Sequence, residues 1–222
     1  MSKAKNRSPS DTDTRSSLTG RRFRAITSDM VAYMGRNLNY GYVNTVAQFP
    51  GRLDAERLHR ASLLSVDAEP ILGCRFVDAL YHPYWLRRDD LDRTPDLFTL
   101  VETRDPDRAL EACLTKHLDP RSDPQIHVSL IRNKHDTLCV KFNHMVGDGF
   151  SMYEYLYLLA GIYNHLEKDP DYTPPINFTD RELVKEIAKR FDLKQKIQIV
   201  RYLLSSVRKD RRNSGSWDFP VS

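Results

Sequence analysis

The sequence lacks any long apolar run, because no stretch approaches the roughly 18 consecutive apolar residues of a membrane-spanning helix. Residues 1–22 are polar and rich in serine, and they lack the apolar segment of a secretory signal. The chain also has only a small excess of positive charge. Its formal net charge is +4, and much of this charge lies at the two ends. We therefore expect a cytoplasmic protein with no membrane span and no nucleic acid as a partner.

Cysteine is scarce, with three residues at Cys74, Cys113 and Cys139. They are far apart, each lies in an apolar segment, and their spacing fits no zinc site. The histidines likewise show no mutual spacing typical of metal ligands. These absences predict buried, reduced thiols and no metal ion.

The composition that is present suits one folded domain with flexible ends. The chain has 222 residues, of which 40% are hydrophobic and 29% are charged, enough for a substantial core. Residues 1–20 contain few apolar side chains that could be buried, so we expect a disordered tail there. Residues 21–168 are expected to form the globular part. Residues 169–210 predict a proline-rich linker followed by charged helices, and residues 211–222 predict a flexible C-terminal tail.

Periodicity within the globular part predicts a mixture of helices and strands. Ser28, Asp54 and Asp105 are predicted helix caps. The helix over residues 150–166 is apolar nearly all round, which predicts that it is largely buried. Strands are expected over residues 40–49, 71–77, 84–87 and 97–102, and as a hairpin over residues 125–132 and 137–143.

The segment that carries chemistry follows this hairpin, where His144 precedes Gly147, Asp148 and Gly149. A histidine at a strand end stands on a rigid element, and a neutral imidazole can take a proton from a hydroxyl or amine near neutral pH. Asp148 suits capping of the following helix or pairing with an arginine, and the two glycines suit the tight turn. His144 as a core histidine without chemical role is the alternative.

This segment resembles the HxxxDG signature shared by chloramphenicol acetyltransferases, condensation domains of peptide synthetases and related acyltransferases that use acyl-CoA. Residues 51–58 and 69–76 also look like the early helix and strand of condensation domains. The resemblance spans residues 23–210 and only the first lobe of the two-lobed family members. It implies an α+β fold, with a mixed and mostly antiparallel sheet packed with helices, in a chloramphenicol-acetyltransferase-like N-terminal lobe over residues 21–168. Residues 169–210 then lead towards a missing second lobe.

By this resemblance His144 is the catalytic base, and Asp148 is the structural aspartate that usually holds an arginine. The chain departs from the family pattern twice. Asn143 stands where many members carry a second histidine, and the expected arginine falls at Gly73. Arg75, two residues on and therefore on the same strand face, can substitute for it.

The resemblance implies an acyltransferase of the EC 2.3.1 type without a bound cofactor. An acyl thioester, on coenzyme A or on the phosphopantetheine arm of a carrier protein, is the co-substrate, and a small-molecule hydroxyl or amine is the acceptor. His144 takes the proton of the acceptor as it attacks the thioester carbonyl. No covalent intermediate is needed, and the sequence holds no Gly-x-Ser-x-Gly nucleophile elbow.

The missing second lobe leaves alternatives open, because an active site built between two lobes loses positioning when one is removed. The chain can be a truncated or split product, a partner polypeptide can supply the second lobe, or copies of the chain can self-associate. The competing hypothesis is a non-catalytic truncated lobe that serves as a binding or interaction module. It predicts an exposed apolar surface on the side of the missing lobe.

Overall fold

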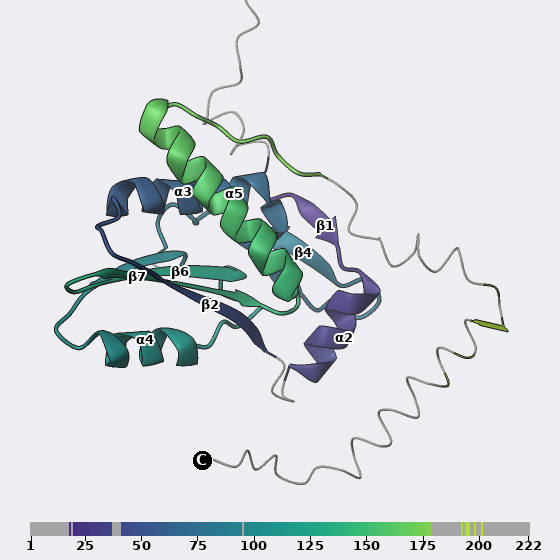
Figure 1. The fold of residues 1–222 in the computed structure, drawn as a ribbon. Helices are drawn as coiled ribbons and strands as arrows, with labels where there is room; N and C mark the ends of the chain where they lie inside the picture. Colours follow the sequence, from purple (N-terminus) through teal and green to yellow (C-terminus); the bar gives the residue numbers. More distant parts are fainter. Residues whose placement is uncertain are drawn as a thin grey trace, which may run out of the picture. The chain divides into compact units, whose positions relative to one another are not determined.

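Figure 1 shows the computed structural model, which describes residues 18, 20–36, 41–94 and 96–178 and five separate positions between 192 and 201. The chain divides into two compact units, Met1–Phe178 and Thr179–Ser222. All the helices and strands given below lie in the first unit. The predicted tails over residues 1–20 and 211–222 and the predicted helices after residue 179 lie almost wholly outside the described residues.

The main sheet has four strands in the order β2-β7-β6-β5. The hairpin of β6 and β7 is antiparallel as predicted, with Ile126 opposite Phe142 and Arg132 opposite Asp136. Strand β2 pairs antiparallel with β7, and β5 pairs parallel with β6. The four strands are β2 (Tyr42–Phe49), β5 (Phe98–Glu102), β6 (Ile126–Arg132) and β7 (Asp136–Asn143).

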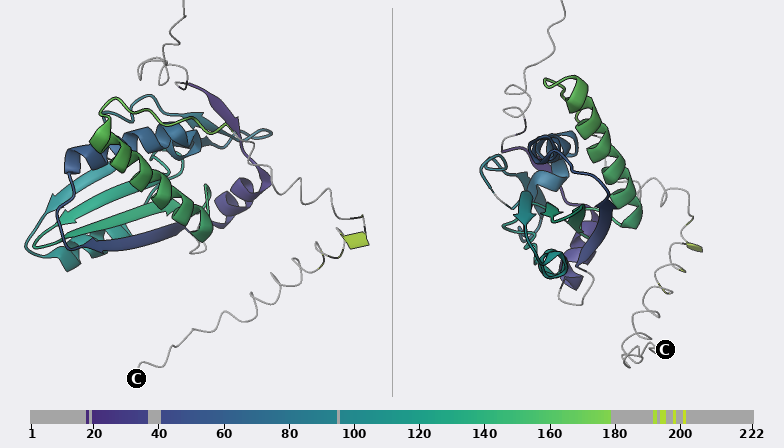
Figure 2. Two further views of the ribbon diagram at one scale, coloured as in Figure 1. Left: turned by 45° about the horizontal axis from the view of Figure 1, so that its top comes forward. Right: turned by 60° about the vertical axis from the view of Figure 1, so that its left-hand side comes forward.

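Helices cover both faces of this sheet (Figures 1 and 2), with α3 (Ala55–Ala68) and α5 (Gly149–Lys168) on one side and α4 (Pro106–Thr115) on the other. Side chains alternate along a strand, so each strand supplies both faces. Val128 and Val140 join the core under α3 and α5, whereas Ser129 and Cys139 face α4. The whole of β6 except its last residue is buried for this reason.

A second, smaller sheet has the strand order β1-β4-β3, all antiparallel. Its own apolar cluster includes Phe76 and Trp85, and it also takes in Met145 from the loop after β7. The Trp85 indole N–H donates to the Asp29 carboxylate over 2.8 Å, so the one polar atom of this buried ring is satisfied. The elements here are β1 (Arg22–Arg24), α2 (Thr27–Gly35), the 3₁₀ turn η1 (Pro70–Gly73), β3 (Cys74–Val77) and β4 (Tyr84–Arg87).

Two of the predicted caps are confirmed and one is wrong. Asp54 accepts a hydrogen bond from the backbone N–H of Arg57, and Asp105 accepts one from that of Arg108, both over 3.0 Å. Helix α2 instead begins at Thr27, so Ser28 lies inside its first turn. The side chain that accepts a hydrogen bond at this end of the helix is Asp29, whose carboxylate accepts from the N–H of Ile26 over 3.1 Å.

Two element predictions also need correction. Residues 71–73 belong to the 3₁₀ turn that starts at Pro70, so β3 begins only at Cys74. Helix α5 was predicted to be largely buried, but only one of its faces is. The opposite face exposes three aromatic side chains. Within the described part of the chain, no helix is both long and apolar enough to cross a bilayer.

Candidate functional site

The candidate site is the loop of residues 144–148, which joins the end of β7 to the start of α5. Its first anchor is Asn143, the last residue of β7, which is buried. The Asn143 side-chain oxygen accepts from the Met145 N–H, and its backbone carbonyl accepts from the Val146 N–H, both over 3.0 Å. These two bonds close a tight turn in the manner of an Asx turn. An asparagine is therefore useful at position 143, because its side chain closes this turn.

The second anchor is the side chain of Met145, which is 5% exposed. It packs in the apolar cluster of the small sheet, with Phe76 and Trp85 among its neighbours. Val146 packs against both this cluster and the main core. The turn is thus tied to both sheets, and a side chain standing on it is held on a rigid base.

His144 is the exposed residue between these two anchors. Its backbone N–H donates to the carbonyl of Gly41, just before β2, over 3.0 Å. Its ring makes no hydrogen bond to any residue that the structure describes. His144 is therefore not a core histidine, and its imidazole is available to a molecule arriving from outside.

Asp148 is the N-cap of α5, as the sequence predicted. One carboxylate oxygen accepts from both the backbone N–H and the hydroxyl of Ser151, each over 3.0 Å. These two bonds, the backbone one first, lower the pKa of Asp148 below its ordinary value. The carboxylate stays ionised and fixes the direction in which α5 leaves the loop.

The two glycines of the motif differ in what they do. A Cβ added at Gly147 would lie 2.7 Å from the Cβ of Ser151, so no side chain fits there without moving α5. A Cβ added at Gly149 would meet no atom within 4 Å, and neither glycine has a positive φ. The prediction that both glycines serve the tight turn is therefore wrong for Gly149, which is simply the first residue of the helix.

The predicted pairing of Arg75 with Asp148 is also wrong among the described residues. Cys74 and Phe76 on β3 point into the cluster that contains Met145. Arg75 lies between them and therefore points to the opposite side of the strand, where it is exposed and lines a separate hollow near Arg88. The partner of Asp148 is Ser151 instead.

Sequence analysis missed the arginine that occupies the space at Gly73, which is Arg87 on β4. A Cβ added at Gly73 would overlap the Arg87 guanidinium. Arg87 is buried, forms an ion pair with the Asp67 carboxylate and donates to the carbonyls of Val66 and Pro70. The only signal in the sequence is a charged residue in a short apolar strand, which does not reveal its partner.

An exposed aromatic stripe begins beside the motif on α5. Phe150, Tyr153 and Tyr157 are 70%, 66% and 80% exposed, and their spacing places them on one side of the helix. Tyr155 on the buried side instead packs in the core and bonds to the Ser65 hydroxyl over 2.9 Å. These three side chains together form an exposed aromatic patch on the surface of the helix.

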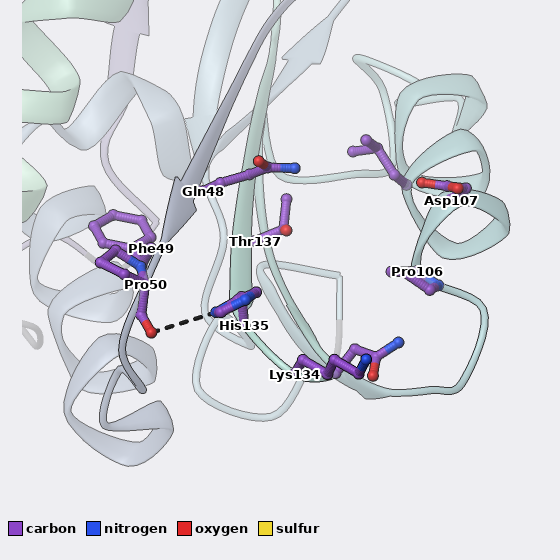
Figure 3. A pocket seen from close by; sticks show the side chains of 10 residues that line it. Gln48, Phe49, Pro50, Pro106, Asp107, Lys134, His135 and Thr137 are labelled. Carbon is purple, nitrogen blue, oxygen red and sulfur yellow. Dashed lines mark hydrogen bonds between the residues drawn. The ribbon is translucent and has the colours of Figure 1, made fainter.

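A hollow of about 440 Å³ lies at the other end of β7, away from His144. Figure 3 shows it between the end of β2, the start of α4 and the turn between β6 and β7. His135 on that turn donates from its ring to the Pro50 carbonyl over 3.3 Å. None of the predicted site residues lines this hollow.

Comparison with solved structures identifies the fold. The first condensation domain of the calcium-dependent antibiotic synthetase, in complex with a substrate analogue, matches with a TM-score of 0.62 and 21% identity, over 78% of this chain and 44% of that one. The starter condensation domain of rhizomide synthetase RzmA matches with a TM-score of 0.58 and 15% identity, over 84% and 50%. The tallysomycin biosynthesis protein TlmII matches with a TM-score of 0.55 and 22% identity, over 77% and 45%.

These similarities confirm the predicted fold class, an α+β lobe of the chloramphenicol-acetyltransferase-like condensation-domain type. The chain spans about half the length of these structures, which is the extent of a single lobe. No protein-family model matches the chain, and no curated protein matches it.

Proposed function

We propose that this chain is one lobe of a condensation-type acyltransferase and that His144 is its general base. The observation that carries the proposal is the placement of His144, which is exposed on a turn fixed to both sheets by Asn143 and Met145. A base that must meet substrates from outside requires this combination of accessibility and rigid support. The condensation-domain fold is the second support, and it makes acyl transfer the reaction class to test.

The proposed reaction is a direct transfer between two substrates. The acceptor hydroxyl or amine attacks the carbonyl carbon of the acyl thioester while the His144 imidazole takes the acceptor proton. The tetrahedral intermediate then collapses, the carbon–sulfur bond breaks, and the imidazolium returns the proton to the departing thiolate. Asp148 acts by fixing the start of α5, and it does not face the reacting atoms in this scheme.

The thioester is a substrate in this scheme, carried by coenzyme A or by the phosphopantetheine arm of a carrier protein. The described lobe offers His144 on an open surface, so a second surface is needed to enclose the thioester and to stabilise the oxyanion. The stripe of Phe150, Tyr153 and Tyr157 next to the motif suits contact with such a surface. We propose that a second lobe, in the same polypeptide or a separate one, completes the site.

The test is the release of free thiol from an acyl thioester. Acetyl-CoA and acetyl-pantetheine would be offered with a set of small primary alcohols and amines, and the released thiol would be followed with a chromogenic disulfide. We expect a His144→Ala variant to lose about 10²–10⁴-fold in rate. The matched control is His135→Ala, which removes an exposed histidine at the far end of β7 and should leave the rate unchanged.

Thiol release that is well above the protein-free rate and equal in the wild type and His144→Ala would overturn the catalytic role. The exposed stripe then favours the second candidate function, a non-catalytic module that binds a partner through α5. That function predicts concentration-dependent self-association or partner binding that weakens when Tyr153 and Tyr157 are changed to serine. A wild-type chain that sediments as a monomer at all concentrations and binds no carrier protein would contradict it.

A further inference from the structure

Cys113 of α4 and Cys139 of β7 face each other on the side of the main sheet away from α3 and α5, with their sulfur atoms 2.7 Å apart. Both are free thiols, and both are buried. An S–S bond is about 2.05 Å long, so the two sulfurs need to approach by only a fraction of an ångström to be joined. Nothing in the proposed acyl transfer uses this pair.

The groups around the pair suit the removal of a proton from Cys113. The Ser129 residue lies directly across from Cys139 in the strand register, and its hydroxyl contributes to lowering the pKa of Cys113. It also contacts Nε2 of His127 over 2.8 Å. Because Nδ1 of His127 faces the Asp96 carbonyl and must donate to it, Nε2 is left as the acceptor. Burial lowers the pKa of His127, so this ring stays neutral beside Ser129.

The same surroundings favour the thiolate form. The pKa of Cys113 is lowered to about 6, chiefly because the Cys139 thiol can donate a hydrogen bond to the Cys113 thiolate. Burial opposes this shift, whereas the Ser129 hydroxyl and the ammonium groups of Lys141 and Lys116 add to it. The pKa of Cys139 is raised by the same contact and by burial, so Cys139 keeps its proton. One sulfur of the pair is therefore the nucleophile and the other is the proton donor.

We propose that Cys113 and Cys139 are an oxidative modification site, a thiol pair that reacts with hydrogen peroxide to form a disulfide joining α4 to β7. The Cys113 thiolate attacks one oxygen of the peroxide, the O–O bond breaks, and sulfenic acid and hydroxide form. The Cys139 sulfur then displaces hydroxide from the Cys113 sulfur and forms the S–S bond. The Cys139 proton and the released hydroxide make water. In total, two thiols are oxidised and one peroxide is reduced to two waters.

Access to the buried pair follows from the way α4 is held. Cys113 is the one fully buried residue of α4, all of whose residues are described. A helix with so little buried surface separates from its sheet at low free-energy cost, and its opening exposes both sulfurs together. The disulfide then fastens the helix at its least exposed residue.

Closing the bond has a consequence near the candidate site. The carbonyls of Leu114 and Lys116, at the end of α4, accept from the ammonium of Lys141 on β7. His117, just beyond α4, bonds to the Tyr42 hydroxyl at the start of β2. Strand β7 leads directly to the turn that carries His144, and the carbonyl of Gly41, just before β2, accepts from the His144 N–H. Oxidation therefore stiffens the support on which that turn stands.

The experiment treats the full chain with hydrogen peroxide, removes the oxidant with catalase, denatures the protein and alkylates it with N-ethylmaleimide. Mass spectrometry should show that two of the three cysteines escape alkylation, with one cross-linked peptide pair containing Cys113 and Cys139. Cys74 is the internal control, since its sulfur contacts the Pro70 carbonyl and lies in the other apolar cluster. Cys74 should be alkylated in full. Reduction with dithiothreitol should restore three alkylated cysteines.

Matched variants separate this pair from general oxidation. Cys74→Ser should still form the cross-link, whereas Cys113→Ser and Cys139→Ala should each abolish it. The oxidised wild type should melt several degrees above the reduced one, because the bond closes a loop of about 26 residues. Three alkylated cysteines after a large excess of peroxide would overturn the proposal. A cross-link through Cys74, or one between two chains, would overturn it equally.

Discussion

Gly147→Ala and Gly149→Ala test the geometry of the motif loop with the same chemical change two residues apart. At Gly147 the new Cβ would lie 2.7 Å from the Ser151 Cβ and 3.3 Å from the Phe142 ring. Carbon atoms pack at about 3.5–4.0 Å, and the Ser151 Cβ is fixed to the α5 backbone, so rotation of a side chain gives no relief. The Phe142 ring is buried, at 2% exposure. The start of α5 must therefore move, at a cost of about 1–3 kcal/mol.

At Gly149 the new Cβ meets only open space. Alanine there replaces the most flexible residue at the first position of a helix, so it is expected to be neutral or to stabilise by up to about 1 kcal/mol. The two alanine variants should consequently differ by about 1–4 kcal/mol in free energy of unfolding. Both variants keep the Asp148 carboxylate and the His144 imidazole, so only the shape of the loop distinguishes them.

Urea denaturation followed by circular dichroism measures this difference, provided the slope of free energy against urea is unchanged between variants. Thermal melting offers a second readout, with a shift of about 2–4 °C per kcal/mol for a chain of this size. Thiol release should fall in Gly147→Ala, because displacement of α5 carries Asp148 and the loop with it. Equal stability of the two variants, or a less stable Gly149→Ala, would refute the reasoning.

The remaining predictions concern two buried charges. Arg132 donates to the Asp136 carboxylate, and the Leu53 N–H donates to it as well, so the pKa of this carboxyl is lowered. Its stabilising effect is therefore present above the unfolded pKa and is lost as the pH falls through the lowered pKa of the folded state. Asp136→Asn should lower the free energy of unfolding by about 1.5–3 kcal/mol at pH 7 and by less at pH 3. Urea titrations at the two pH values measure both losses. Equal losses at pH 7 and pH 3 would contradict the role of the Asp136 carboxylate. Arg87→Met removes the cation beside the buried Asp67 carboxylate and should lower the free energy of unfolding by about 3–5 kcal/mol. The double variant Arg87→Met, Asp67→Leu should recover much of this stability. Additive losses for the two substitutions would contradict the pairing.

Local signals in the sequence predicted much of the fold. The caps at Asp54 and Asp105 and the hairpin of β6 and β7 depend on neighbouring residues, so a single sequence reveals them. The end of the hairpin also placed His144 correctly, after the last paired residue of β7. The role of Asp148 as the cap of α5 was equally local, because the groups that donate to its carboxylate belong to Ser151, three residues away.

Contacts between segments that are distant in the chain could not be predicted from the sequence. The burial of α5 depends on which of its sides meets the main sheet, and its composition is apolar on both. Arg75 was expected near Asp148 because the resemblance puts an arginine at Gly73 and strand alternation places Arg75 on the same face, but the strand turns its other side towards the loop. The arginine at Gly73 comes from β4, and only the pairing of β3 with β4 brings it there.

The sequence by itself determined most of the helices and strands and the position of the motif, because these depend on residue type and on spacing along the chain. Only the tertiary structure decided that His144 is exposed on a doubly anchored turn, that Arg87 pairs with Asp67, and that Cys113 meets Cys139. The two side-chain pairs join residues that are 20 or more positions apart in the sequence. The exposure of His144 depends on which faces of the strands the helices pack against. Packing of whole elements sets such relations, and many sequences with the same local pattern could pack differently.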